Sequence, residues 1–153
     1  MERSDFNYMQ TAYNMARKAA AEDEVPVGAV IIHDNTIIAK AFNQIESLKD
    51  PTAHAEMIAI TQASSYLESK VLNDTEIFVT LEPCPMCSMA IVLAKIKRLV
   101  FAAKDPRTGA AGSVYNIVQD KSLNHQVIVE QGLMKLECSA LLKDFFKERR
   151  GGG

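Results

Sequence analysis

The spacing of apolar residues predicts a helix and then two strands in the first third of the chain. Over residues 5–21, apolar side chains recur at helical spacing along one face, at Met9, Ala12, Tyr13, Ala16 and Ala20. Two apolar runs of strand length follow at 27–33 and 36–42. Asp34 and Asn35 separate these runs and suit a tight hairpin turn, so we expect the two strands to pair.

The remainder of the chain alternates between helical and strand patterns. Asp50-Pro51-Thr52 is a stop-and-cap sequence, and it predicts a helix whose apolar face carries Ala55, Ile58, Ala59, Ala63 and Tyr66. The next expected elements are strands at 76–80 and 99–103, a helix at 84–96, a loop at 105–109 and a candidate last strand at 126–130. The terminal helix, at 133–149, is predicted to turn five residues inward: Cys138, Leu141, Leu142, Phe145 and Phe146.

This order of elements predicts an α/β fold. Strands that alternate with helices indicate a mostly parallel sheet with helices on both faces, to which the opening hairpin adds one antiparallel pair. The chain shows no internal repeat, and we expect residues 1–150 to form one domain. Gly151-Gly152-Gly153 is typical of a flexible tail.

Composition narrows the class of protein. The chain has 153 residues, 48% of them hydrophobic and 24% charged, which is ordinary for a soluble globular domain. No apolar run reaches the length of a membrane span, and the polar N-terminus lacks the apolar segment of a secretory signal. Three cysteines without a disulfide pattern suit a reducing, cytoplasmic location. Because the net charge is −2, any nucleic-acid surface must be a local cluster of cations.

Two short motifs carry the candidate chemistry. His54-Ala55-Glu56 comes first, and Pro83-Cys84-Pro85-Met86-Cys87 follows, each at the expected start of a helix. His54, Cys84 and Cys87 are good zinc ligands, and a set of three protein ligands leaves a fourth position for water, as in catalytic zinc sites. Glu56 would be free to move protons. Helix N-termini at the metal would favour thiolates and developing negative charge.

Other interpretations of the two cysteines are a four-ligand structural zinc site and a redox pair. A second Cys-x-x-Cys that could complete an all-cysteine site is absent from the sequence, and His33 and His125 lack local ligand spacing. Cys138 lies in an apolar helical stripe and is interpreted as a buried core thiol.

The motifs together match a known signature. His-x-Glu followed by Pro-Cys-x-x-Cys is the pattern of zinc nucleobase deaminases. The chain resembles the bacterial tRNA-specific adenosine deaminases of the cytidine deaminase superfamily, and the resemblance spans residues from about 6 to 150. The matching stretches are Glu24–Val30, Asp50–Glu56, Val79–Cys87, Thr108–Ser113, Leu123–His125 and Leu141–Phe146.

The resemblance implies a cytidine deaminase-like fold, a three-layer α/β/α sandwich around a five-stranded mixed sheet. It implies a homodimer that hydrolyses adenosine to inosine at the wobble position of a tRNA anticodon. One Zn²⁺ per subunit would be held by His54, Cys84 and Cys87, and Glu56 would shuttle protons. Asn43 matches an asparagine that contacts the flipped nucleoside, although the sequence equally allows a simple turn asparagine.

An anticodon stem-loop needs cations for its phosphates. The candidates are Lys104, Arg107, Lys147, Arg149 and Arg150, with Lys121 and Lys143 also available. The alternative interpretation is a solvated surface charge, which is favoured for Lys121, and the terminal cations also suit a helix C-terminus. The alternative function is deamination of a free base or nucleotide, such as guanine, cytosine or deoxycytidylate. A zinc-stabilised RNA-binding module is a third hypothesis, and an unliganded Glu56 argues against it.

Overall fold

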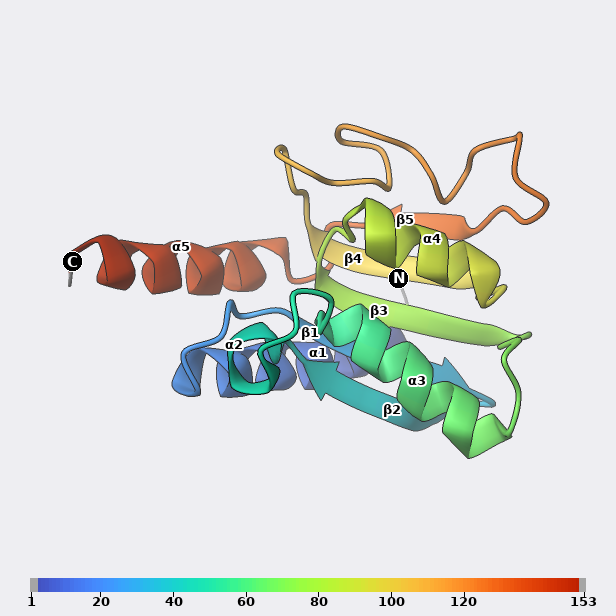
Figure 1. Cartoon of the computed structure of the whole chain (residues 1–153), viewed down its shortest axis with the longest axis horizontal. Helices are drawn as coiled ribbons and strands as arrows, with labels where there is room; N and C mark the ends of the chain where they lie inside the picture. The colour runs from blue at the N-terminus through green and yellow to red at the C-terminus, as the bar shows by residue number, and fades with distance from the viewer. Residues whose placement is uncertain (1–2, 152–153) are drawn as a thin grey trace.

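The chain folds around one sheet. The computed structural model describes the backbone from residue 3 to residue 151 and side chains from residue 4 to residue 149. Its strands are β1 Gly28–His33, β2 Thr36–Phe42, β3 Thr75–Leu81, β4 Arg98–Ala103 and β5 Ile128–Gln131. Its helices are α1 Arg3–Ala21, α2 Ile45–Leu48, α3 Ala55–Leu67, α4 Pro85–Leu93 and α5 Lys135–Gly151 (Figure 1).

The sheet has the order β2-β1-β3-β4-β5 and is mixed. β1 pairs antiparallel with both β2 and β3, whereas β3, β4 and β5 pair in parallel. The expectation of a mostly parallel sheet with one antiparallel pair is therefore wrong, since there are two antiparallel pairs. The reason is that α3 carries the chain from β2 across β1, so β2 and β3 run in the same direction and β1 lies between them.

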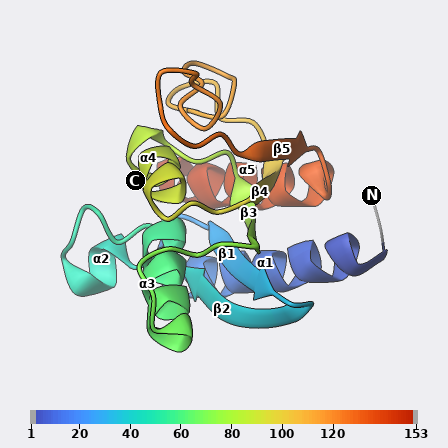
Figure 2. The same cartoon turned by 90° about the vertical axis from the view of Figure 1, so that its right-hand side faces the viewer.

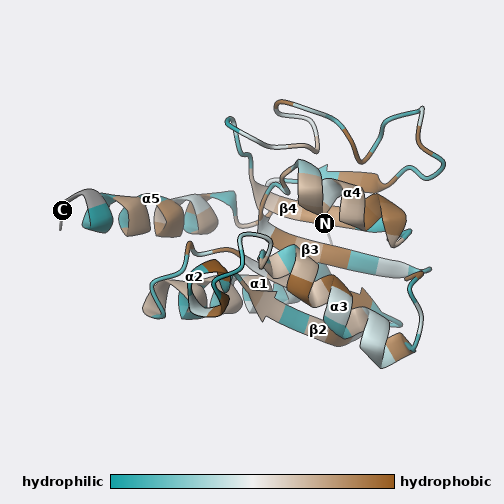
Figure 3. Ribbon diagram, in the orientation of Figure 1, coloured by the Kyte–Doolittle hydropathy of each residue, from teal (hydrophilic) through white to brown (hydrophobic). Residues whose placement is uncertain are grey.

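Helices cover both faces of the sheet, which confirms the three-layer sandwich. The buried cluster on one face joins residues of α3 and α4, such as Ala59 and Ile91, to Ile31 of β1. The cluster on the other face joins Met9 of α1 and Cys138 of α5 to neighbouring strands. Figure 2 shows α3 and α4 on one side of the strands and α1 and α5 on the other. In Figure 3, hydrophobic colours run along α4 and the central strands.

The hairpin and the core thiol are as predicted. Asp34 and Asn35 both have positive φ, 50° and 59°, as a two-residue hairpin turn requires. Cys138 is 2% exposed, and burial together with the nearby Glu137 raises the pKa of its thiol to about 12. No helix within residues 3–151 combines the length and apolar character needed to span a membrane.

Several details differ from the sequence expectations. α2 was not predicted, because four residues are too few to show a helical period. Tyr66 and Phe146 were expected to face inward and are instead 63% and 46% exposed. α5 extends to Gly151, the first glycine of the expected tail, while residues 152 and 153 lie outside the described range.

The cap expected ahead of α3 is also displaced. Asp50 accepts hydrogen bonds from the N–H and hydroxyl of Thr52, at 2.8 and 2.7 Å, and so forms a local turn. The N-cap residue of α3 is His54, whose side chain makes no capping bond. The imidazole of His54 is therefore not engaged in capping α3.

Candidate active site

Two helix N-termini meet at the predicted metal ligands. His54 is the N-cap residue of α3, and Cys84 is the N-cap residue of α4; neither side chain caps its own helix. Cys87 lies in the first turn of α4 and is fully buried. Pro85 takes the first helical position, where a missing N–H costs no hydrogen bond. The sequence expectation that each ligand segment starts a helix is confirmed.

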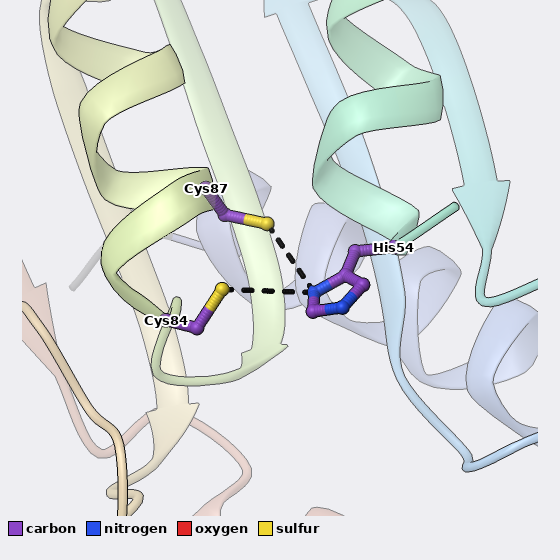
Figure 4. Close-up of side chains that lie close together, drawn as sticks. All are labelled: His54, Cys84 and Cys87. Atoms are coloured by element: carbon purple, nitrogen blue, oxygen red, sulfur yellow. Dashed lines mark hydrogen bonds between the residues drawn. The ribbon is translucent and has the colours of Figure 1, made fainter. Parts of the chain in front are cut away.

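The three ligand side chains point toward a common centre (Figure 4). The Nδ1 atom of His54 lies 3.7 Å from the Sγ of Cys84 and 3.5 Å from the Sγ of Cys87. All three ligand atoms lie within 4.8 Å of one another. Zinc with bonds of about 2.3 Å to sulfur and 2.0 Å to nitrogen in tetrahedral geometry would separate nitrogen from sulfur by roughly 3.5 Å. The donor set and its spacing therefore fit a tetrahedral zinc ion.

The three side chains of the cluster shift one another's pKa values. The hydrogen bond with Cys87 and, to a smaller extent, the one with His54 lower the pKa of Cys84 to about 4, against the effect of burial. The hydrogen bond with Cys84 and burial raise the pKa of Cys87. The hydrogen bond with Cys84, more than the charge of Glu56, raises the pKa of His54. The cluster thus favours a thiolate at Cys84, and metal binding would displace the remaining protons.

Glu56 is buried beside this cluster. It lies in the first turn of α3, two residues after His54, and is 3% exposed. Burial raises the pKa of its carboxyl group to about 7, while its own backbone N–H and the charge of His54 act in the opposite direction. A carboxyl group with a pKa near neutrality can both accept and release a proton at physiological pH. It is not one of the three clustered ligands.

Asn43 lies next to the ligand helix. It follows β2 directly, is 6% exposed, and its Oδ1 accepts a hydrogen bond of 2.8 Å from the backbone N–H of Ala55. The side chain therefore satisfies one of the first N–H groups of α3 and links the end of β2 to the residue after His54. This contact was not expected from the sequence, and it orients the amide so that its Nδ2 donor points away from Ala55.

Two buried glutamates that the sequence analysis did not single out organise the surrounding loops. Glu24 accepts hydrogen bonds from the backbone N–H groups of Glu46 and Ser47, at 3.0 and 2.8 Å, and so holds α2 after Asn43. Glu82, two residues before Cys84, accepts hydrogen bonds from the loop after β4. Each stands at the edge of an apolar stretch in the sequence, and that position was the available signal.

Several of the predicted cations line one groove. A cavity of about 760 Å³ lies between the loop after β4 and the second half of α5. Its cationic lining residues are Lys104, Arg107, Lys143 and Arg149, beside Phe146. His54, Cys84 and Cys87 do not line it, and Leu81, three residues before Cys84, is its nearest lining residue to them along the chain. The structure thus gathers Lys104, Arg107 and Arg149 at one place.

The terminal cations differ in their surroundings. Lys147 is exposed and is not among the lining residues of the groove. Arg149 pairs with Asp23 at 2.5 Å, and its guanidinium lies 3.4 Å from the ring centre of Phe145. The side chain of Arg150 lies outside the part of the chain that the structure describes. Lys143, which was considered only as an available cation, lines the groove directly.

Known proteins resemble this chain over nearly its whole length. The model of the MafB19-like deaminase family matches residues 3–150. The tRNA-specific adenosine deaminase of Aquifex aeolicus (strain VF5) is 47% identical over 143 residues, 94% of this chain and 94% of that protein. Its counterpart in Bacillus subtilis (strain 168) is 42% identical over 143 residues, 94% of this chain and 89% of that protein.

A solved structure is similar as well. It comes from work on A-to-I editing by tRNA:A34 deaminases at the wobble position of transfer RNA, and it superposes with a TM-score of 0.86 at 39% identity. The match covers 89% of this chain and 99% of that one.

Proposed function

This chain belongs to the tRNA-specific adenosine deaminases, within the MafB19-like deaminase family, and we propose that it converts adenosine to inosine at the wobble position of a tRNA anticodon. The observation that carries the proposal is the His54, Cys84 and Cys87 cluster with the buried carboxyl of Glu56 beside it. A three-ligand set is typical of a catalytic zinc, whereas a structural zinc is closed by four protein ligands. The site therefore supports an enzyme rather than a zinc-stabilised binding module.

His54, Cys84 and Cys87 would hold one zinc ion per subunit. When bound, zinc would lower the pKa of a water molecule toward neutrality and so supply the nucleophile. The two helix N-termini direct partial positive charge at the same place, which favours the thiolate ligands.

Glu56 moves the protons of the hydrolysis. It accepts a proton from the water as the oxygen bonds to C6 of the base, and it delivers a proton to the adjacent ring nitrogen. Glu56 then takes the proton of the new C6 hydroxyl and passes it to the amino group as the C6–N bond breaks, so C6 becomes a carbonyl, ammonia leaves and the base becomes hypoxanthine. A pKa near 7 suits these opposite roles, because neither protonation state of Glu56 is strongly disfavoured at neutral pH.

The substrate base must leave its stack to reach a buried site, and an unpaired anticodon loop allows this more readily than a duplex. Lys104, Arg107 and Lys143 line the groove that begins beside Leu81, and they would contact phosphates of the stem-loop. Phe146 is exposed in the same groove and offers a ring face to an unstacked base. Lys147 and Arg149 extend this cationic region along α5 in the proposal, and Arg150 follows them in the sequence.

The direct test is a mass-shift assay with several substrates in parallel. A tRNA or anticodon stem-loop with adenosine at the wobble position should gain the mass change of conversion to inosine, and the same stem-loop with guanosine there should not. Adenosine, guanine and cytidine nucleotides serve as the free substrates. Turnover of a free base or nucleotide with none on the stem-loop would support the alternative deaminase function instead.

We also propose that the protein is a homodimer that works in the cytoplasm. Tyr66 and Leu93, at the C-terminal ends of α3 and α4, are 63% and 70% exposed, and a second copy of the chain would cover them. The cysteine ligands need a reducing compartment. Light scattering should give twice the chain mass, and Leu93→Glu should shift it toward the monomer; a wild-type monomer at micromolar concentration would refute the dimer.

A further inference from the structure

Glu82 is a buried carboxylate whose hydrogen-bond partners all come from one loop. It is 2% exposed, and Oε1 accepts from the backbone N–H of Asp105 at 3.0 Å. Oε2 accepts from the backbone N–H groups of Ala111 and Ser113, at 2.9 and 3.0 Å. The hydroxyl of Ser113 donates to Oε1 as well. Within the described residues no cation pairs with this carboxylate, so the loop alone compensates the buried charge.

Gly109 is required for this wrapped conformation. A Cβ atom at residue 109 would lie 2.4 Å from the Cδ of Glu82 and 2.5 Å from the carbonyl oxygen of Asp105. The loop therefore passes so close to the carboxylate that only glycine fits. We name residues 105–113 the Glu82-bound loop.

The same loop is bonded to the segment that carries the first cysteine ligand. The backbone N–H of Ala110 donates to the carbonyl oxygen of Pro83, the residue before Cys84, at 2.8 Å. Glu82 itself donates its backbone N–H to Ala103 at 2.8 Å. The loop after β4 is thus bonded to the segment before α4 at two adjacent residues, the side chain of Glu82 and the carbonyl oxygen of Pro83.

Two groove cations depend on this connection. Lys104 immediately precedes the Glu82-bound loop, and Arg107 lies within it; both line the groove. The backbone N–H of Arg107 is held in turn by the carboxylate of Asp105, at 2.9 Å. The contacts of Glu82 therefore hold the segment that carries Arg107 and begins directly after Lys104.

We infer that Glu82 is a positioning residue, whose carboxylate holds the Glu82-bound loop against the Cys84 segment and so sets where the RNA phosphates lie relative to the metal site. The inference rests on the proposed RNA substrate. Glu82 touches neither the substrate nor the metal in this scheme; it acts through Lys104 and Arg107. Its loss should therefore weaken stem-loop binding more than it changes the metal content.

The test compares Glu82→Gln with Glu76→Gln, which removes a carboxylate near the start of β3, the strand that Glu82 directly follows. Glu82→Gln keeps the size of the side chain but turns an acceptor into a donor that faces N–H groups. Losing charge-assisted bonds in a buried site should raise the Kd for an anticodon stem-loop by about tenfold or more and flatten its salt dependence. Zinc should stay near one per chain, and Glu76→Gln should bind the stem-loop as wild type does.

Gly109→Ala and Ser113→Ala give independent disruptions of the same contacts. Gly109→Ala displaces the loop without altering any charge, and it should weaken binding like Glu82→Gln. Ser113→Ala removes one donor hydroxyl and should fall between wild type and Glu82→Gln, which keeps the test usable if Glu82→Gln does not fold. Wild-type Kd and salt slope in all of the folded variants would overturn the inference.

Hydrogen exchange separates this inference from the proposed function. The amides of Asp105, Ala111 and Ser113 should exchange faster in Glu82→Gln than in wild type, whether or not the protein acts on RNA. Unchanged exchange at these amides would overturn the positioning role. Suppose instead that exchange is faster in Glu82→Gln but the wild-type protein neither binds nor deaminates the stem-loop. That result would refute the RNA function and leave the structural role of Glu82 intact.

Discussion

The side-chain oxygen of Asn43 accepts a hydrogen bond of 2.8 Å from the backbone N–H of Ala55, the residue that separates His54 from Glu56. One amide thus joins the end of β2 to the start of α3. Because Oδ1 is engaged, the Nδ2 group is the part of Asn43 that remains to donate to a nucleoside. Asn43 therefore has a structural contact and a proposed substrate contact on different atoms.

Substitutions at Asn43 should separate these two contacts. Asn43→Ala removes both, and should lower the melting temperature and cost about 1–3 kcal/mol in kcat/KM, the range for an unmade hydrogen bond in a buried site. Asn43→Asp keeps an acceptor for Ala55 but has no Nδ2 donor, so it should lose activity with a smaller loss of stability. Wild-type kcat/KM on tRNA in both variants, with zinc retained, would leave Asn43 a purely structural role.

Glu56→Gln should separate proton transfer from metal binding. The amide keeps the shape of the side chain and leaves His54, Cys84 and Cys87 intact, so zinc content should stay near one per chain. Turnover should fall by roughly two to four orders of magnitude, the usual effect of losing a general acid–base. Single-turnover rates on a saturating stem-loop measure this. A zinc-loaded variant with near-normal turnover would mean that another group moves the proton.

Zinc removal should affect the fold as well as the reaction. The candidate ligands come from the starts of α3 and α4, and a metal that binds only the folded state stabilises it. Elemental analysis should find about one zinc per chain, and a strong chelator should lower the melting temperature reversibly. Cys138→Ser, which alters the buried thiol outside the cluster, is the control for general thiol effects. Full activity in zinc-free protein would contradict the site.

The sequence predicted the clustering of His54, Cys84 and Cys87 better than it predicted their surroundings, and the reason is physical. His54, Cys84 and Cys87 are rare residue types at ligand spacing, and both segments start helices, so local patterns were sufficient. The strand pairing of the sheet was harder to predict. The antiparallel pairing of β1 with β3 depends on α3 carrying the chain across β1, which no local sequence pattern encodes. Glu82 was missed for a related reason, because its partners at 105–113 are distant in sequence.

Burial was predicted where a helical face was fully covered and missed at helix ends. Ala55, Ala59 and Ala63 are buried as expected, whereas Tyr66 is exposed because its neighbour Leu67 takes the next position against the core. The same holds for Phe146 in α5. The cations could be identified from the sequence, but their ion-pair partners could not. The ion pair between Arg149 and Asp23, for example, joins residues far apart in the chain.

Acid should destabilise the protein partly through Glu24. Burial acts to raise the pKa of this carboxyl, but hydrogen bonds from Glu46 and Ser47 outweigh it and hold the pKa below its ordinary value of 4.5. The folded state therefore binds this proton less readily than the unfolded state, so the stabilisation is complete above pH 4.5 and is lost as pH falls below it. The difference in melting temperature between wild type and Glu24→Gln should shrink on acidification. A difference that stays constant down to pH 3 would contradict this role.

Salt dependence should show which cations meet the RNA. Each phosphate that a cation neutralises steepens the fall of affinity with salt by about 0.7 for single strands. Replacing the groove residues Lys104, Arg107 and Lys143 with alanine should therefore flatten the slope of log affinity against log salt by roughly two. Replacing Lys147, Arg149 and Arg150 should flatten it less, because Arg149 is already paired with Asp23.

The matched control replaces three exposed lysines that do not line the groove, Lys70, Lys121 and Lys135. This control loses the same charge as the groove and terminal triple variants. It should keep a slope near that of wild type, because its three lysines lie away from the groove and are not expected to contact phosphates. Asp23→Asn adds a further check, because it releases Arg149 and should strengthen binding only if Arg149 faces phosphate. If the terminal variant loses the larger slope and the groove variant none, the RNA follows the end of α5 and not the groove. A wild-type protein with no slope would favour a free base as substrate, because a base makes no phosphate contacts.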